Sequence, residues 1–334
     1  MAVYPKVSVL MPMFNCERYV HGAINSILAQ TFTNFELLVM DDGSTDRSSA
    51  VARSYKDPRL RVISDTHCGL VATLNRGIDG ARGEYIARMD ADDLSQPKRL
   101  ERQVSYMEAH PELIMVGTDA HIIDLDGKLT GQYLQMPRRG QRIRVALCGA
   151  NTFIHGSVLM RRRAVLNVGG YRSEFITAED YDLWLRLGEI GTVANLTAPL
   201  YKLRVHHNSK TAVEGKSLGG RYAARARTCA LQRQLYGHDC LGYIQPELWM
   251  PEVDTSKKPN STAGTITLID WAQSFLSLGE LPLSYKLATQ THRHSLRQAH
   301  VFTVLFRCYA SKASILGMLT LMCRGWLFFM HRDR

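Results

Sequence analysis

Short apolar runs separated by helical patterns dominate the first part of the chain. Runs typical of strands occur at Val7–Met11, Phe35–Met40, Leu60–Ser64, Tyr85–Met89 and Ile114–Thr118. Between them, apolar residues recur at helical spacing in segments such as Tyr19–Gln30 and Pro97–Ala109. This alternation predicts βαβ units, and therefore an α/β fold with a mainly parallel sheet flanked by helices.

The pattern changes after the fifth run. Asp124–Lys128 predicts a hairpin turn, and another strand is expected at Ser157–Met160, so the sheet should be mixed. Beyond about Gly215 the pattern becomes helical, apart from a polar stretch at Thr255–Gly264 that is typical of a surface linker. We therefore divide the chain into a sheet domain, residues 1–214, and a helical C-terminal region, residues 215–334.

Carboxylates gather where two of the predicted strands end. Asp90-Ala91-Asp92-Asp93 follows one strand, and Asp41-Asp42-Gly43-Ser44 follows another. Parallel strands present such residues at one edge of the sheet, where ligands bind. Clustered carboxylates favour a hard divalent cation such as Mn²⁺ or Mg²⁺. The alternative is that the acidic residues only cap the following helices, and Ser44 is itself a candidate cap.

The composition supports a folded protein that contains a core. The chain has 334 residues, 45% of them hydrophobic. Its seven cysteines are scattered without a Cys-x-x-Cys pair, which argues against a disulfide framework and a zinc site and favours a reducing cytoplasm. No cleavable apolar leader is evident, because Lys6 leads directly into the first predicted strand.

The net charge of +10 lies mainly in the C-terminal region, which has 15 Lys and Arg against 7 Asp and Glu from Gly215 onward. Without interleaved aromatic residues, this region favours an anionic membrane surface over nucleic acid. Ile315–Met330 is apolar but contains Arg324, and at 16 residues it is too short to span a bilayer. It suits an interfacial helix, and the alternative is a helix packed on the protein or on a second copy.

Several motifs occur in the order and spacing of a known enzyme family. Pro12-Met13-Phe14-Asn15, Asp41–Asp46, Gly83–Ile86 and Asp90–Asp93 resemble the motifs of the family 2 glycosyltransferases. The resemblance extends more loosely through His155–Val158, Glu179-Asp180 and Arg204–His206, and so covers roughly the first 210 residues. It implies the GT-A fold and inverting sugar transfer from a nucleotide-sugar, most often a UDP-sugar.

The resemblance also implies roles for individual residues on the donor side. Pro12, Phe14 and Asn15 would line the uracil and ribose pocket, and Asp42 would accept a hydrogen bond from the uracil N–H. In the acidic cluster, Asp90 would contact the ribose and Asp92 would bind the metal. Asp93 is a close rival of Asp92 for the metal.

On the acceptor side, Asp180 matches the family's catalytic aspartate and would be the general base. Glu179, Asp180 and Asp182 also resemble an ordinary acidic first turn of a helix. His206, in the Arg-x-His element, would lie near the donor phosphates and could bind the metal, although a lone histidine is often structural. His155 is a weaker candidate for the site.

The Gln-x-x-Arg-Trp motif of the processive members does not occur, so transfer of a single sugar is expected. The acceptor would be a glycan hydroxyl, with a polyprenyl-diphosphate-linked oligosaccharide at the inner membrane face as the favoured form. Two other functions stay open. A sugar nucleotidyltransferase would need a glycine-rich loop, but residues 8–20 contain no glycine. A non-catalytic nucleotide-sugar-binding or scaffold protein would be expected to lack the base or a metal aspartate.

Overall fold

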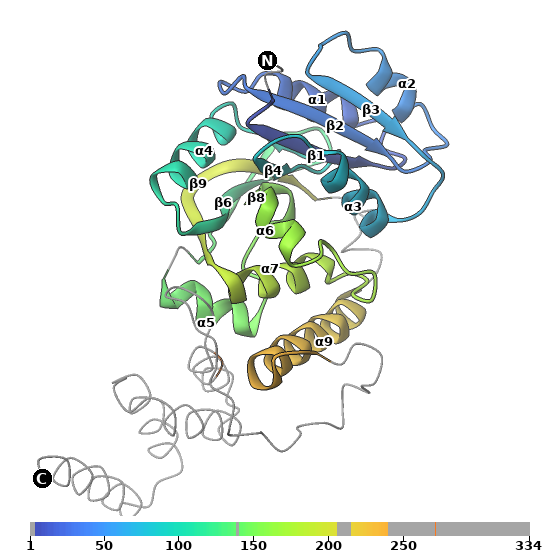
Figure 1. Ribbon diagram of the computed structural model, residues 1–334. Coiled ribbons are helices and arrows are strands. Elements are labelled where there is room, and N and C mark those ends of the chain that lie inside the picture. Colours follow the sequence, from blue (N-terminus) through green and yellow to red (C-terminus); the bar gives the residue numbers. More distant parts are fainter. Residues whose placement is uncertain (1–3, 138–139, 206–214, 240–270, 272–334) are drawn as a thin grey trace, which may run out of the picture.

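The computed structural model describes residues 4–137, 140–205, 215–239 and 271, and its centre is a nine-stranded mixed sheet (Figure 1). The strands are β1 (Val7–Met13), β2 (Phe35–Asp41), β3 (Leu60–Ser64), β4 (Tyr85–Arg88), β5 (Leu94–Ser95), β6 (Leu113–Ile123), β7 (Leu129–Leu134), β8 (Leu159–Arg161) and β9 (Thr192–Arg204). Their order is β3-β2-β1-β4-β8-β6-β9-β5, and β7 pairs with β6. The first four strands of this order are parallel, and β8 runs antiparallel to both of its neighbours.

Helices cover both faces of the sheet. They are α1 (Val20–Leu28), α2 (Ser48–Arg53), α3 (Leu70–Gly80), α4 (Arg99–Ala109), α5 (Gln141–Gly149), α6 (Arg162–Asn167), α7 (Glu179–Ile190) and α9 (Gly215–Tyr236), with a short 3₁₀ helix, η1, at His155–Ser157. One apolar cluster joins the sheet to α1, α2 and α4, and the other joins it to α3, α5, α6, α7 and α9. Alternate side chains of β1 point to opposite faces of the sheet. Val9 and Met11 therefore belong to the first cluster, and Leu10 belongs to the second.

The predicted elements are confirmed with small shifts at their ends. The hairpin turn forms between β6 and β7, where Asp124 N donates to Lys128 O over 2.9 Å and Gly127 takes φ +82°. The predicted strand at Ser157 starts instead at Leu159, because Ser157 lies in η1 and its Oγ accepts a hydrogen bond from Thr118 N.

The prediction that Ser44 caps a helix is wrong. The helix α2 begins at Ser48, whose backbone N–H donates to Asp46 Oδ1 over 2.9 Å. Ser44 Oγ instead accepts from the backbone N–H of Asn15. Ser44 therefore joins the turn after β1 to the turn after β2.

Gly83 shows why the turn before β4 needs a glycine. A Cβ at this position would lie 2.7 Å from the carbonyl carbon of Val7, and Gly83 N donates to Ser8 Oγ over 2.8 Å. Any side chain would therefore push the turn away from β1. This close approach sets the register of β4 beside β1, and with it the position of the acidic residues that follow β4.

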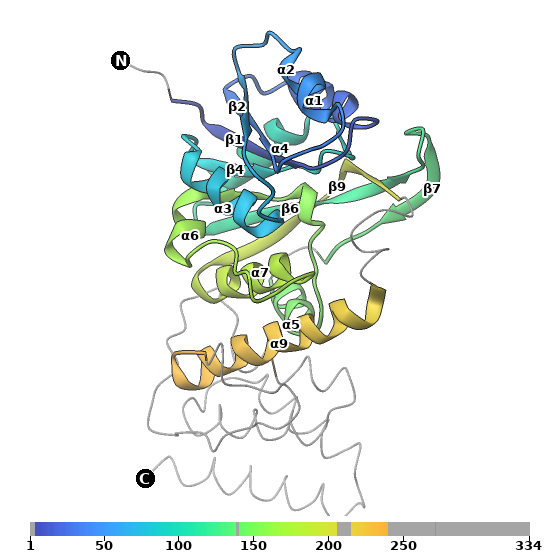
Figure 2. The same cartoon turned by 90° about the vertical axis from the view of Figure 1, so that its right-hand side faces the viewer.

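The helix α9 lies along α5 and α7 on the side away from the sheet (Figures 1 and 2). Ala226, Cys229 and Ala230 of α9 belong to the same apolar cluster as α7. The division at Gly215 stays a prediction. The predicted linker at Thr255–Gly264 and the tail at Ile315–Met330 lie outside the described residues. Among the residues that the structure describes, no helix has the length and apolar character needed to cross a bilayer.

Candidate active site

Three neighbouring strand ends bring the predicted donor residues to one edge of the sheet. Asp42 follows β2, and its backbone N–H donates to Met13 O at the end of β1 over 2.9 Å. On the other side of β1, Met89 N donates to Leu10 O over 3.0 Å, which places Asp90 beyond the end of β4. The carboxyl ends of parallel strands form the usual binding crevice of such sheets. The two acidic turns predicted from the sequence therefore lie on either side of β1.

The turn after β1 is held against the turn after β2 by Asn15. Its side-chain Oδ1 accepts a hydrogen bond from Thr45 N over 2.8 Å, and its backbone lies in the left-handed region at φ +47°. Asparagine tolerates this conformation better than most residues. Pro12, at the end of β1, is partly exposed and opposite Met40 of β2. Asn15 therefore helps to hold the two turns together at this edge of the sheet.

Asp42 is buried and organises the loop between β3 and α3. Its carboxylate accepts hydrogen bonds from Cys68 N (2.9 Å), Gly69 N (3.0 Å) and Thr73 Oγ1 (2.9 Å). Burial alone would raise the pKa of Asp42, but the hydrogen bonds from Cys68 and Thr73 and the nearby His67 outweigh it and lower the pKa. Asp42 is thus an ionised carboxylate that already has several donors from its own chain.

An aromatic pair stands beside Asp42. The rings of Phe14 and His67 have centroids 4.4 Å apart with an interplanar angle of 31°. Phe14 is 46% exposed, which is unusual for a phenylalanine and leaves a face of the ring open to a ligand. His67 Nδ1 lies 2.9 Å from Asp42 Oδ2. The pair offers a flat surface of the kind on which a nucleobase stacks.

The acidic turn after β4 is embedded in the protein. Asp90 forms an ion pair with the buried Arg88 of β4, and its backbone N–H donates to Tyr201 Oη over 3.1 Å. Asp93 is 2% exposed, and its Oδ1 accepts from Arg204 N over 2.6 Å. The Arg204 side chain then donates from Nε to Asp92 O over 2.6 Å. The end of β9 therefore fixes the turn that carries the three aspartates.

The aspartates of this turn are crowded together and partly or fully buried. Burial raises the pKa of Asp93 well above its ordinary value, and the charges of Asp90 and Asp92 raise it further. Burial also raises the pKa of Asp90, although Arg88 opposes the shift. A bound cation would relieve this repulsion. The turn is therefore electrostatically prepared for a cation.

The residues fit a metal that is shared with a substrate phosphate. Within the described residues, no three His, Cys, Asp or Glu side chains gather into a complete metal site. A Mg²⁺-type nucleotide site does not need one, since it uses one or two carboxylates and takes its other ligands from phosphate and water. Asp92 is partly exposed at the turn, whereas Asp93 is buried beneath it, which favours Asp92 as the metal ligand.

Asp180 lies in the first turn of α7, on the face of the sheet opposite α1, α2 and α4. Its Oδ2 accepts from Asn151 Nδ2 over 2.7 Å, and its Oδ1 accepts from Tyr181 N over 2.6 Å. The side chain is partly exposed. A carboxylate oxygen has more than one lone pair, so each oxygen of Asp180 can accept more than one hydrogen bond.

A short chain of contacts connects Asp180 to the acidic turn. A Cβ on Gly156 of η1 would lie 2.6 Å from Asp90 Oδ2, so η1 is packed directly against that turn. The adjacent His155 Nε2 lies 2.9 Å from Tyr171 Oη, and its ring packs edge-on against Trp184 of α7. Burial raises the pKa of Tyr171, Arg88 opposes the shift, and the charges of Asp180, Glu179 and Asp90 add to it. His155 therefore joins the two halves of the site structurally.

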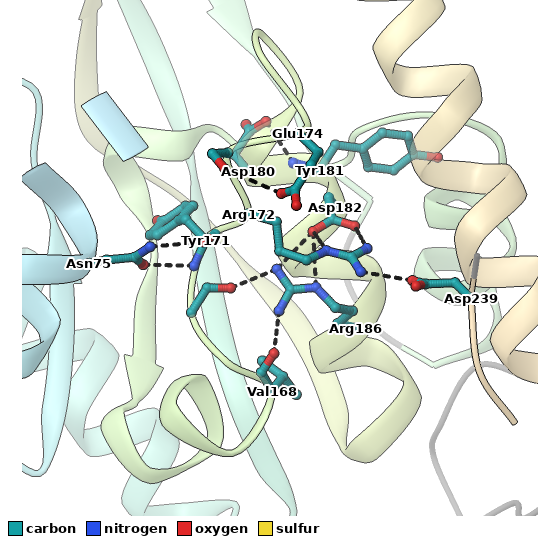
Figure 3. A network of polar contacts seen from close by, with 12 residues as sticks. Asn75, Val168, Tyr171, Arg172, Glu174, Asp180, Tyr181, Asp182, Arg186 and Asp239 are labelled. Carbon is teal, nitrogen blue, oxygen red and sulfur yellow. Dashed lines mark hydrogen bonds and ion pairs between the residues drawn. The ribbon is translucent and has the colours of Figure 1, made fainter. Parts of the chain in front are cut away.

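The other two carboxylates of the first turn of α7 are less suited to be a base. Asp182 is fully buried and accepts from Arg186 Nη2 over 2.8 Å and from Arg172 Nε over 2.9 Å (Figure 3). A fully buried carboxylate that is bonded to two guanidinium groups cannot reach a ligand. Glu179 is 4% exposed. Of the three, Asp180 alone combines exposure with helix-terminal placement.

Some residues of the site were not predicted. Arg88 is the charged residue in a strand whose other residues are apolar, and that mismatch is the signal that could have found it. His67 and Asn151 lie in loops, where the sequence pattern carries no such signal. His206 lies outside the described residues, so its metal role stays a prediction.

Comparisons with known proteins identify the family and the fold of this chain. Residues 8–169 match the family model Glycosyl transferase family 2. The chain is 41% identical to EpsE of Bacillus subtilis (strain 168) over 208 residues, 60% of this chain and 73% of EpsE. It is 34% identical to the O-antigen biosynthesis glycosyltransferase WbnJ of Escherichia coli over 211 residues, 61% of this chain and 81% of WbnJ.

Two solved structures share the fold. The mannosyltransferase PcManGT from Pyrobaculum calidifontis, in complex with GDP-Man and Mn²⁺, matches with a TM-score of 0.55 and 16% identity over 99% of this chain and 82% of PcManGT. TarS 1-349 of S. aureus, in complex with UDP-GlcNAc, matches with a TM-score of 0.55 and 16% identity over 92% of this chain and 91% of TarS. The sequence matches and the shared fold lead to one conclusion: the chain belongs to glycosyl transferase family 2 and is a glycosyltransferase with the GT-A fold.

Proposed function

We propose that this enzyme transfers a single sugar from a UDP-sugar, with inversion and with a divalent metal, to a hydroxyl of a lipid-linked glycan in polysaccharide biosynthesis. The observation that supports the proposal is the packing of η1 between the acidic turn and α7, the helix that carries Asp180. Gly156 of η1 lies against Asp90, and His155 of η1 packs on Trp184 of α7. One side can hold a nucleotide diphosphate and the other can activate an acceptor. Sugar transfer needs both functions in one site.

On the donor side, Phe14 and His67 would stack on the base, and the Asn15 turn would line the ribose pocket. Asp42 would fix the loop that carries His67, and it remains a candidate for the uracil N–H. Asp90 would contact the ribose. Asp92 would hold the metal, which when bound neutralises the charge that develops on the leaving diphosphate. The choice of a UDP-sugar rests on the resemblance of these motifs, because TarS was solved with UDP-GlcNAc and PcManGT with GDP-Man at equal similarity.

On the acceptor side, Asp180 would accept the proton of the attacking hydroxyl as the new glycosidic bond forms and the bond to the diphosphate breaks. Asn151 would keep the carboxylate turned toward the acceptor. Direct attack by the hydroxyl on the face opposite the leaving group inverts the anomeric carbon. The chain therefore needs no carboxylate nucleophile.

The relatives support a role in polysaccharide assembly. WbnJ is named for O-antigen biosynthesis, and AmsE of Erwinia amylovora, 34% identical over 203 residues, is named for amylovoran biosynthesis. The basic C-terminal region supports contact with an anionic membrane at its cytoplasmic face, where a polyprenyl-diphosphate-linked acceptor would lie. Deleting Ile315–Arg334 should then reduce sedimentation with anionic vesicles, and equal sedimentation of both forms would contradict this part.

A donor screen tests the function. The full chain is incubated with UDP-, GDP- and dTDP-sugars, with Mn²⁺, with Mg²⁺ and with a chelator, and nucleoside diphosphate release is measured with and without polyprenyl-diphosphate-linked acceptors. We expect metal-dependent release from one UDP-sugar, stimulated by an acceptor and lost in Asp180→Asn. Exclusive use of a GDP-sugar would refute the donor assignment, and full activity with chelator would refute the metal. The anomeric configuration of the product by NMR tests inversion.

A further inference from the structure

A buried network of ion pairs ties the catalytic helix α7 to the residues that follow α9. Its members are three cations, Arg172, Arg186 and Arg233, and three anions, Asp182, Glu189 and Asp239. None of the six side chains is more than 17% exposed. The charges balance, so the network keeps its low exposure without an unpaired ion.

Arg172 is the centre of this network (Figure 3). Its guanidinium binds both oxygens of Asp182 in α7, and its Nη1 donates to Asp239 Oδ2 over 2.8 Å. The same guanidinium lies over the ring of Phe175, with Cζ 4.8 Å from the centroid. Arg172 therefore connects the loop before α7, the start of α7 and the end of α9.

The loop that Arg172 holds leads directly to the base. It runs from Tyr171 to Ala178, where Phe175 is fully buried and Thr177 has φ +68°. Asn75 of α3 binds the backbone of Tyr171 at the start of the loop, through two hydrogen bonds of 2.8 Å. A threonine at positive φ is strained and persists only when its surroundings hold it. Asn75 fixes the start of the loop at Tyr171, and Arg172 ties the loop to Asp182 in α7.

We propose that Asp239 is a positioning residue of the transferase: by holding Arg172 against Asp182, it sets the Tyr171–Ala178 loop and the first turn of α7 so that Asp180 faces the acceptor. The helix α9 and the residues after it are then part of the catalytic unit. This inference rests on the proposed role of Asp180. It goes beyond that role because it assigns a catalytic effect to a residue outside the sheet domain.

The network itself offers a matched control. Glu189 lies at the other end of α7 and pairs with Arg233 through two contacts of 2.8 Å, without touching Arg172. Asp239→Asn and Glu189→Gln each remove one buried negative charge. Asp239→Asn takes a partner from both Arg172 and Arg233, whereas Glu189→Gln takes one from Arg233. Both variants should therefore lose stability. The proposal predicts that Asp239→Asn alone disturbs the loop before the base.

The test measures turnover, donor affinity, melting temperature and amide hydrogen exchange in the full chain. We expect Asp239→Asn to lower kcat about tenfold more than Glu189→Gln does, since small displacements of a catalytic group cost large factors in rate. Affinity for UDP should match wild type in both variants. Exchange should accelerate in Asp239→Asn at the amides of Phe175, Ala178 and Asp182, which are hydrogen-bonded within this segment. Asp239→Glu, which keeps the charge, should restore most of kcat.

Suppose that kcat falls equally in Asp239→Asn and Glu189→Gln, and that each loss matches the fall in melting temperature. Asp239 would then only stabilise the protein, and the proposal would be wrong. Wild-type exchange in the Tyr171–Ala178 loop of Asp239→Asn would overturn the proposal as well. Exchange does not depend on turnover, so it separates this inference from the role of Asp180. If Asp180→Asn keeps full activity while the loop still loosens in Asp239→Asn, the base assignment fails and the hold on the loop stands.

Discussion

The two halves of the site are built in different ways. On the donor side, Asp42 and Asp90 follow β2 and β4, the two parallel strands that flank β1, and backbone hydrogen bonds between β2, β1 and β4 bring them together. On the acceptor side, Asp180 is held by Asn151 from a distant loop, and its helix by Arg172 and Asp239. The sheet positions the proposed donor residues through the backbone, whereas side-chain contacts position the proposed base. Substitutions that leave the backbone intact should therefore affect donor binding and turnover separately.

The largest effect is expected for Asp92→Ala, which removes the proposed metal ligand from the donor half. Metal stabilisation of the leaving group is worth several kcal/mol, so we expect kcat/KM to fall by about 10³-fold. The metal dependence of UDP binding, measured by calorimetry, should also weaken. The control is Asp126→Ala, an exposed aspartate that pairs with Arg18. Wild-type turnover in Asp92→Ala would transfer the role to Asp93.

Asp180→Asn should give the next largest loss, and only on the acceptor side. Asparagine keeps the size of the side chain but cannot take up the proton, so turnover should fall by about 10² to 10⁴-fold. Affinity for UDP and for the metal should stay at wild-type values. Glu174→Gln, an exposed acid in the loop before α7, is the control. A proportional loss of donor affinity would mean that the two halves are not separable at this residue.

Asn151→Ala tests whether the base needs its side-chain partner. Loss of the 2.7 Å hydrogen bond frees the Asp180 carboxylate to rotate, and we expect kcat to fall about tenfold. Donor affinity should not change, because Asn151 contacts the acceptor side. Asn151→Gln, which keeps the amide but extends it, should lose less than Asn151→Ala. Equal activity in Asn151→Ala and wild type would show that the Tyr181 N–H suffices to orient the base.

The smallest effect is expected for Phe14→Ala, which removes the ring that packs against His67. Stacking on a base contributes from about 1 kcal/mol upward, and at this lower bound UDP affinity should fall about fivefold, whereas kcat at saturating donor should hold. Tyr4→Ala removes an aromatic ring that is 69% exposed and serves as the control. A fall in kcat at saturation, with UDP affinity kept, would place Phe14 outside the base pocket.

The sequence predicted the donor half well for a physical reason. Apolar runs of period two and strand-end carboxylates are local patterns, so Asp42, Asp90 and Asp92 could be placed at one edge of a sheet before the structure was known. Ser44 was misassigned because a serine after a strand has the same local signal whether it caps a helix or receives a bond from another turn. Only the tertiary structure distinguishes these two roles of the serine.

The partners of Asp180 could not be predicted in the same way. Asn151 is 29 residues from it in the sequence, and Asp239 is 67 residues from Arg172. Neither belongs to a periodic pattern, and buried ion pairs have no local signature. In the sequence, Arg172 and Arg186 look like ordinary surface residues of a loop and a helix. Only the structure shows that both pair with Asp182.

The place of β4 in the sheet also has a consequence for biosynthesis. The strand pairs on one side with β1 and on the other with β8, whose residue Arg161 lies opposite Tyr85. While the chain emerges from the ribosome, β1 to β4 can pair before β8 exists, and β4 is then an open edge for several seconds at about 5–20 residues per second. An unpaired edge strand can pair with another chain, and a charged side chain that points inward hinders such pairing. Arg88, which later neutralises Asp90, is such a charge, so we expect Arg88→Leu to raise the aggregated fraction of newly made protein.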